Sequence, residues 1–125
     1  MARRKREPKL GKVLNELHQV FPALTAAWLL DTDGFHVAGD RLGQRDADTV
    51  CALCASALAS VERMGREIGQ GEPSSLVVGL REGALVLHSI DAETWLAVEV
   101  GQREQLGMAQ LAVRYARPLL ATTGG

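Results

Sequence analysis

The chain has 125 residues, of which 46% are hydrophobic and 23% are charged, and its formal net charge is −1 at pH 7. This length fits one domain, and the composition is that of a globular protein rather than a disordered, fibrous or disulfide-rich one. The apolar runs are far shorter than the roughly 20 residues of a membrane-spanning helix. No apolar stretch follows the basic start, so we expect no signal peptide, no membrane span and a cytoplasmic location.

The charge is unevenly distributed along the chain. Residues 1–12 hold six basic side chains and one glutamate, a net charge of +5, which leaves −6 for the rest of the chain. We expect residues 1–9 to form a basic flexible tail. A tail of this kind can also touch phosphates or an anionic membrane surface, and that alternative stays open. No aromatic residue accompanies the basic ones, so nucleic acid is not an expected partner.

Apolar side chains at three- and four-residue spacing predict a first helix over residues 10–21, which Pro22 ends. Two apolar segments follow, residues 25–30 and 35–38, and together they predict a β-hairpin. Between them, Asp33-Gly34 supplies the backbone geometry of a tight reversal. Asp46 or Asp48 is expected to cap the next helix, because a carboxylate accepts the free amide protons of a first helical turn.

Residues 47–68 predict a long helix with two contrasting surfaces. Cys51, Cys54 and Leu58 belong to an apolar stripe that steps by three and four residues and can lie against a sheet. A second surface is formed by small side chains, namely Ala52, Ala55, Ser56 and Ala59. Solvated helices normally carry charged residues along the outer face, so small residues indicate close approach of another backbone. The alternative is that they are good helix formers on a solvated face.

Three strands and a last helix follow, over residues 76–81, 84–90, 95–100 and 106–120. The connections between the strands are short enough for hairpins, which predicts antiparallel pairing. Residues 76–80 and 85–87 are apolar without alternation, and this pattern is typical of a sheet covered on both faces by helices. Residues 122–125 are expected to form a flexible C-terminus.

The candidate chemical groups do not assemble into a site. Cys51 and Cys54 have Cys-x-x-Cys spacing, but no second ligand pair accompanies them and both lie inside a helix on its apolar stripe. We predict that they are buried small hydrophobes; a dimer that brings two such pairs together is the open alternative. His18, His36 and His88 fall on three different elements, and we expect His18 to be exposed. No catalytic, metal-binding or cofactor-binding residue is predicted, and no enzyme activity.

The layout resembles the roadblock/dynein light chain domain family over residues 10–120. The features that carry the resemblance are Phe21-Pro22 before the first strand, the hairpin at residues 30–38, Glu62-Arg63-Met64-Gly65, Trp95-Leu96-Ala97-Val98 and Leu106-Gly107. The resemblance implies an α+β, profilin-like fold with element order α-β-β-α-β-β-β-α. Its five-stranded antiparallel sheet has the central helix on one face and the two terminal helices on the other. The resemblance assigns residues 10–121 to the roadblock domain.

The resemblance also implies a homodimer. The central helices of two copies would lie side by side, and the two sheets would join through the strand that follows this helix. The residues expected at the interface are Ala52, Ala55, Ser56, Ala59, Leu76, Val78 and Leu80.

Family members act as scaffolds or beside bacterial Ras-like GTPases, and one gliding-motility branch stimulates GTP hydrolysis. The resemblance therefore implies a non-catalytic regulator or scaffold that binds a Ras-like GTPase through its paired central helices. Stimulation of GTP hydrolysis and assembly beyond the dimer are further expectations. The expected contact residues are Glu62, Arg63, Arg66 and Glu67. The alternative is a small-molecule sensor of the profilin, PAS or GAF type, which needs a ligand cavity between sheet and helix.

Overall fold

The computed structural model describes residues 2–40 and 45–123. The elements are α1 (Ala2–Val20), β1 (Leu24–Asp31), β2 (His36–Asp40), α2 (Ala47–Glu67), β3 (Ser75–Gly79), β4 (Ala84–Ser89), β5 (Thr94–Val100), a 3-10 turn (Arg103–Gln105) and α3 (Leu106–Thr123). The strands form one sheet in the order β2-β1-β5-β4-β3, with every pair antiparallel. The predicted element order and the five-stranded antiparallel sheet are confirmed.

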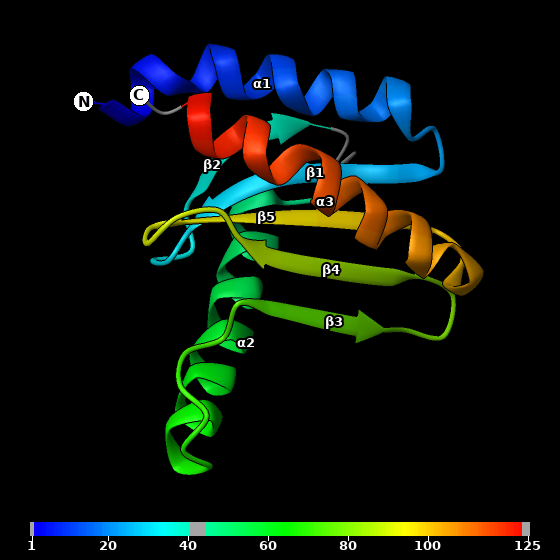
Figure 1. Cartoon of the computed structure of the whole chain (residues 1–125). Coiled ribbons are helices and arrows are strands. Elements are labelled where there is room, and N and C mark those ends of the chain that lie inside the picture. The colour runs from blue at the N-terminus through cyan, green and yellow to red at the C-terminus, as the bar shows by residue number, and fades with distance from the viewer. Residues whose placement is uncertain (1, 41–44, 124–125) are drawn as a thin grey trace.

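The sheet separates two layers of helices (Figure 1). On one face, α1 packs on β1 and β2, and α3 packs on β4 and β5. On the other face, α2 crosses the strands and continues past β3, which is an edge of the sheet. This is the predicted arrangement of one central helix opposite two terminal ones.

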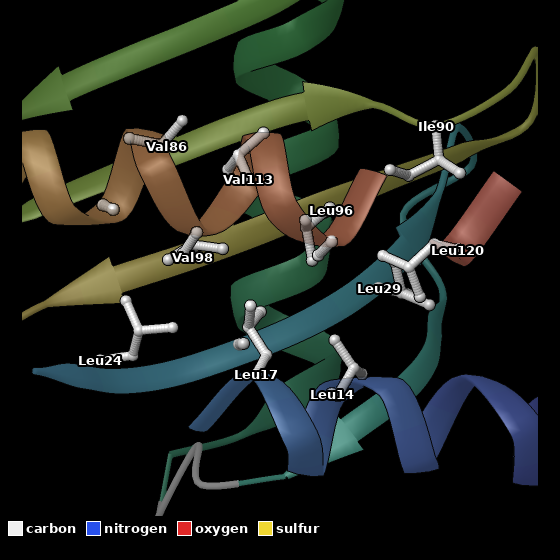
Figure 2. Close-up of a cluster of buried hydrophobic side chains, with 14 of the residues drawn as sticks. Leu14, Leu17, Leu24, Leu29, Val86, Ile90, Leu96, Val98, Val113 and Leu120 are labelled. Atoms are coloured by element: carbon white, nitrogen blue, oxygen red, sulfur yellow. The ribbon is translucent and has the colours of Figure 1, made fainter. Parts of the chain in front are cut away.

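The larger hydrophobic core lies between the sheet and the two terminal helices. Leu14 and Leu17 of α1 and Val113 of α3 point toward the sheet, where they meet Leu29 and Val98 (Figure 2). Alternate residues of the same strands point to the other face, so Trp28 and Ala97 belong to a second, smaller core under α2. Burial on both faces explains why β1 and β5 are continuous apolar runs.

The terminal helices differ from the prediction at their ends. Helix α1 begins at Ala2 rather than at residue 10, so residues 2–9 are helical where a flexible tail was predicted. Apart from Pro8, these residues are Ala, Arg, Lys and Glu, which are good helix formers, and they extend a helix that has already been nucleated. Helix α3 continues to Thr123, beyond the predicted end at residue 120. Residues 122 and 123 of the predicted flexible C-terminus are therefore helical. Residues 124 and 125 lie outside the described residues.

The prediction that His18 is exposed was wrong, because its side chain is buried. His18 lies four residues after Leu14 and therefore shares the helical face that packs on the sheet. The prediction that residues 76–80 and 85–87 are covered on both faces was wrong for β3. In β3 only Leu76 and Val78 are half-buried, because α3 lies over β4 and β5 and does not extend over the edge strand.

Candidate interaction surface

Helix α2 begins at a carboxylate cap. Asp46 Oδ1 accepts hydrogen bonds from the backbone amides of Asp48 and Thr49, at 3.0 and 3.4 Å. The Thr49 hydroxyl donates to Asp46 Oδ2 at 3.0 Å and holds the pKa of Asp46 below its usual value. Of the two residues predicted to cap this helix, the structure selects Asp46.

The stripe of α2 that faces the sheet is short. Cys51, Cys54 and Leu58 are its buried residues, and they pack against Trp28 and Trp95. Burial raises the pKa of the Cys51 thiol to about 11 and also raises that of Cys54. Both cysteines are free and buried, which confirms their prediction as small hydrophobes. Beyond Leu58 the helix leaves the sheet, and its second half extends past β3 (Figure 1).

One flank of α2 faces the turn between β1 and β2. Gly34 has a φ of +92°, and a Cβ at this position would lie 3.2 Å from both Ala52 Cα and Ala55 Cβ. Two of the small residues predicted to meet a second copy thus have a close neighbour in their own chain. Ser56 and Ala59 are exposed. The assignment of these four residues to a dimer interface stays a prediction.

A small cavity lies on this same flank, between α2 and the start of β5. It measures about 70 Å³ and is lined by residues that include Ala59, Glu62, Pro73 and Trp95. Pockets for small molecules usually measure about 300–1,000 Å³. This cavity is therefore too small for the ligand that the sensor alternative requires, whereas a groove between α3 and the sheet, at about 360 Å³, lies within that range.

The opposite flank of α2 carries large apolar side chains in contact with solvent. Leu53 is 66% exposed, Met64 58% and Ile68, the residue that caps the helix, 64%. Ala57 is also exposed. The intervals of four, seven and four residues place all of them on one side of the helix. A continuous apolar stripe in water is typical of a protein-protein contact.

The edge strand supplies an apolar floor beside this flank. Leu76 and Val78 pair with Leu87 and Leu85, and Leu76, Leu85 and Leu87 all belong to the core under α2, so this side of β3 faces the same way as the helix. Val78 is half-buried, and Leu80, just after the strand, is exposed. We call the combined area the α2–β3 surface; it consists of Leu53, Ala57, Met64, Ile68, Val78 and Leu80.

The four charged residues predicted to contact a partner lie in two places. Arg66 Nη1 donates to Glu62 Oε1 at 2.8 Å, and Glu62 also lines the small cavity. Arg63 and Glu67 are four residues apart and lie on the side of α2 that points away from the sheet, together with Ser56 and Ser60. We call these last four residues the outer crest.

Within residues 2–40 and 45–123, no group of three or more His, Cys, Asp or Glu side chains is placed to hold a metal ion. Over the same ranges, no helix combines the length and the apolar character needed to cross a membrane.

Comparison with known proteins supports the fold. The family model of the Roadblock/LC7 domain matches residues 10–99. The chain belongs to the Roadblock/LC7 domain family. Comparison of this roadblock chain with curated protein sequences gave no match. The predicted family and the predicted fold class are confirmed.

Solved structures share the roadblock fold over nearly the whole chain. MglB of Myxococcus xanthus is 21% identical with a TM-score of 0.82, covering 91% of this chain and 93% of that one. A Roadblock/LC7 domain from Streptomyces avermitilis is 28% identical with a TM-score of 0.71, covering 88% and 96%. Profilin IA of Acanthamoeba castellanii is 16% identical with a TM-score of 0.66, covering 92% and 98%.

Proposed function

We propose that two copies of this roadblock chain form a homodimer, and that the dimer regulates a Ras-like GTPase through the outer surface of its paired α2 helices. The observation that carries the proposal is the α2–β3 surface, which leaves an apolar helix flank and a sheet edge open side by side. In this proposal the chain contributes no reacting group. Any acceleration of GTP hydrolysis comes from changing the conformation of the GTPase.

Pairing through β3 is the first element of the proposed dimer. An edge strand presents backbone N–H and C=O groups without a neighbouring strand, and an apolar edge of this kind promotes uncontrolled aggregation unless it is covered. Two copies of β3 related by a two-fold axis would pair antiparallel and join the two five-stranded sheets. The side of β3 that faces α2 then becomes continuous with the same side of the partner's β3.

The course of α2 explains how the helices would pair. Because α2 extends past β3 (Figure 1), its second half would lie over the sheet of the partner. By symmetry the partner's α2 would return over Val78 and Leu80 and lie along the flank that carries Leu53 and Met64. Full burial of one such side chain contributes about 1.5–3 kcal/mol. The apolar residues of the α2–β3 surface would thus be buried together.

The outer crest would then face the GTPase. Each α2 has 21 residues and is about 30 Å long, and two helices side by side are about 20 Å wide. The resulting platform of about 600 Å² approaches the roughly 800 Å² that each partner contributes to a standard interface. Small side chains at Ser56 and Ser60 keep this platform flat, while Arg63 and Glu67 offer charges for recognition. We place the dimer in the cytoplasm, where Ras-like GTPases act.

Family membership supports self-association. A solved structure that shares this fold is described as MglB with a tetrameric arrangement, and we extend self-association to this chain. The family resemblance supports the choice of a Ras-like GTPase as the partner.

The test mixes the purified chain with a Ras-like GTPase encoded near its gene, loaded with GDP or with a non-hydrolysable GTP analogue. We expect a complex with one nucleotide form, measured by calorimetry, in which the double variant Arg63→Glu, Glu67→Arg weakens binding at least about tenfold. Lys12→Glu on α1 is the control, since it changes another exposed charge on the other face of the sheet.

Single-turnover phosphate release distinguishes an activator, which raises the hydrolysis rate, from a scaffold, which binds without changing it. The proposal fails if the GTPase binds in neither nucleotide form, or if the double variant binds as tightly as the wild type.

A further inference from the structure

A groove runs along the edge of the sheet on the face opposite α2. It has a volume of about 360 Å³. Val77 and Val86 form its floor, Val113 of α3 forms part of its wall, and Arg114, Arg117 and His88 surround it. Val77 is 43% exposed, whereas Val86 on the adjacent strand is 3% exposed. The open part of the groove therefore lies over β3.

The spacing of helices and strands explains why this strip is left open. Packed helices lie about 8–10 Å apart, and neighbouring strands about 4.8 Å, so one helix covers about two strands. Helix α1 covers β1 and β2, and α3 covers β4 and β5. The fifth strand is left without a helix of its own.

In the proposed dimer, on which this inference rests, β3 lies beside the partner's β3. The two uncovered strands together are about 10 Å wide, which is the width of one more helix. The groove of each copy then becomes half of a single trough on the two-fold axis, with an α3 helix along each side.

The walls of this trough are basic. Helix α3, β3 and β4 contain Arg114, Arg117 and His88 and no aspartate or glutamate. Arg117 Nε donates to the Ser89 carbonyl at 3.1 Å, which holds this side chain at the groove, and Arg114 is exposed. The dimer would present both arginines twice. The valine floor favours an apolar helix face, and the arginines favour carboxylates on both flanks of that helix.

From this charge complementarity and this width, we infer that the trough binds one acidic amphipathic helix of a partner protein per dimer. The apolar face of that helix would lie on Val77 of the two copies. Its aspartates and glutamates would reach Arg114 and Arg117. The site is on the opposite face of the sheet from the proposed GTPase surface, so the dimer could hold both partners at once.

The test uses the full chain and a fluorescein-labelled peptide of about 18 residues, about 27 Å long as a helix, with leucine on one face and glutamate on the others. Fluorescence anisotropy is expected to saturate at one peptide per two chains, with affinity falling as salt is added. The double variant Arg114→Glu, Arg117→Glu is expected to weaken binding at least about tenfold. Arg114→Gln, Arg117→Gln should have a smaller effect, and Lys12→Glu should have none.

Equal affinity for a peptide with lysine in place of glutamate would overturn the inference, as would unchanged binding to the charge-reversed variant. Saturation at one peptide per chain would overturn the shared trough. The native mass of the same wild-type sample separates this inference from the proposed function. A monomeric wild type contradicts the proposed dimer, whereas a dimer that binds the GTPase but no acidic peptide overturns only the trough.

Discussion

Gly39 lies in β2 at a point where the backbone of β1 leaves no room for a side chain. Its φ is +107°, and a Cβ would lie 2.6 Å from both the Ala27 carbonyl oxygen and Trp28 Cα. Both contacts are with backbone, which cannot move aside without disturbing the pairing of β1 with β2. At this residue the positive φ and the close approach act together, and only glycine satisfies both.

We therefore expect Gly39→Ala to lower the free energy of unfolding by about 2 kcal/mol or more. The control is Gly11→Ala in α1, where a Cβ would meet no heavy atom within 4 Å. Alanine is the better helix former, so this change should raise stability by about 0.5–1 kcal/mol. Urea unfolding of both variants checks the prediction, and shifts of the same sign would contradict it.

The two cysteines give a second prediction for single residues. Burial raises the pKa of Cys51 to about 11 and raises that of Cys54. About one Cys51 thiol in a thousand is then ionised at pH 8, and only the thiolate reacts quickly. We expect Ellman's reagent to label neither cysteine of the folded chain within minutes at pH 8, and both after unfolding in guanidinium chloride. Rapid labelling of the folded chain would show that α2 does not hold them against the sheet.

The roles of single residues could be predicted from the sequence where they depend only on neighbouring residues in the chain. The Asp46 cap depends on amides two and three residues away, and the buried cysteines depend on the spacing of one helix face. The contact of Gly34 with Ala52 and Ala55 was not predictable, because it arises only when the hairpin turn lies against α2. The small residues predicted the close approach of another backbone, and the family resemblance supplied only a second copy as that neighbour.

Helix α2 shows the limit of periodicity for a whole element. Its spacing correctly predicted a long helix with a sheet-facing stripe, but it did not predict that the apolar residues Leu53, Ala57 and Met64 are exposed to solvent. Leu53 and Ala57 point to a flank of α2 rather than to the sheet, and Met64 lies beyond Leu58, where the helix leaves the sheet. A helical pattern gives the direction of each side chain but not where the neighbouring layer ends.

Substitutions on the two flanks of α2 test which flank meets the second copy. We expect Leu53→Arg and Met64→Arg to give monomers by size-exclusion chromatography with light scattering, because a buried, unpaired charge in the interface costs several kcal/mol. Ala59→Arg, on the flank that faces the hairpin turn, should remain dimeric. Monomers from Ala59→Arg together with dimers from Leu53→Arg would instead support the small-residue surface that the sequence predicted.

The fold of the whole molecule followed from the order of elements and from the family resemblance. Short connections predicted that β1 pairs with β2 and that β3, β4 and β5 pair in turn. The central pairing of β1 with β5, in which Trp28 lies opposite Ala97, joins segments far apart in the sequence. No local pattern encodes that pairing, and the resemblance alone implied the five-stranded sheet. The exposed side of β3 likewise became visible only once the helices were placed on the sheet.

Amide hydrogen exchange in β3 of the wild-type chain tests the proposed dimer most directly. Both edges of β3, Ser75–Gly79, should then be hydrogen-bonded, one to β4 and one to the partner's β3. We predict that all amides of this strand exchange as slowly as those of β4 at micromolar concentration, and that half become fast in Leu53→Arg. Fast exchange of the outward-facing β3 amides in the wild type at every concentration would contradict pairing through this strand.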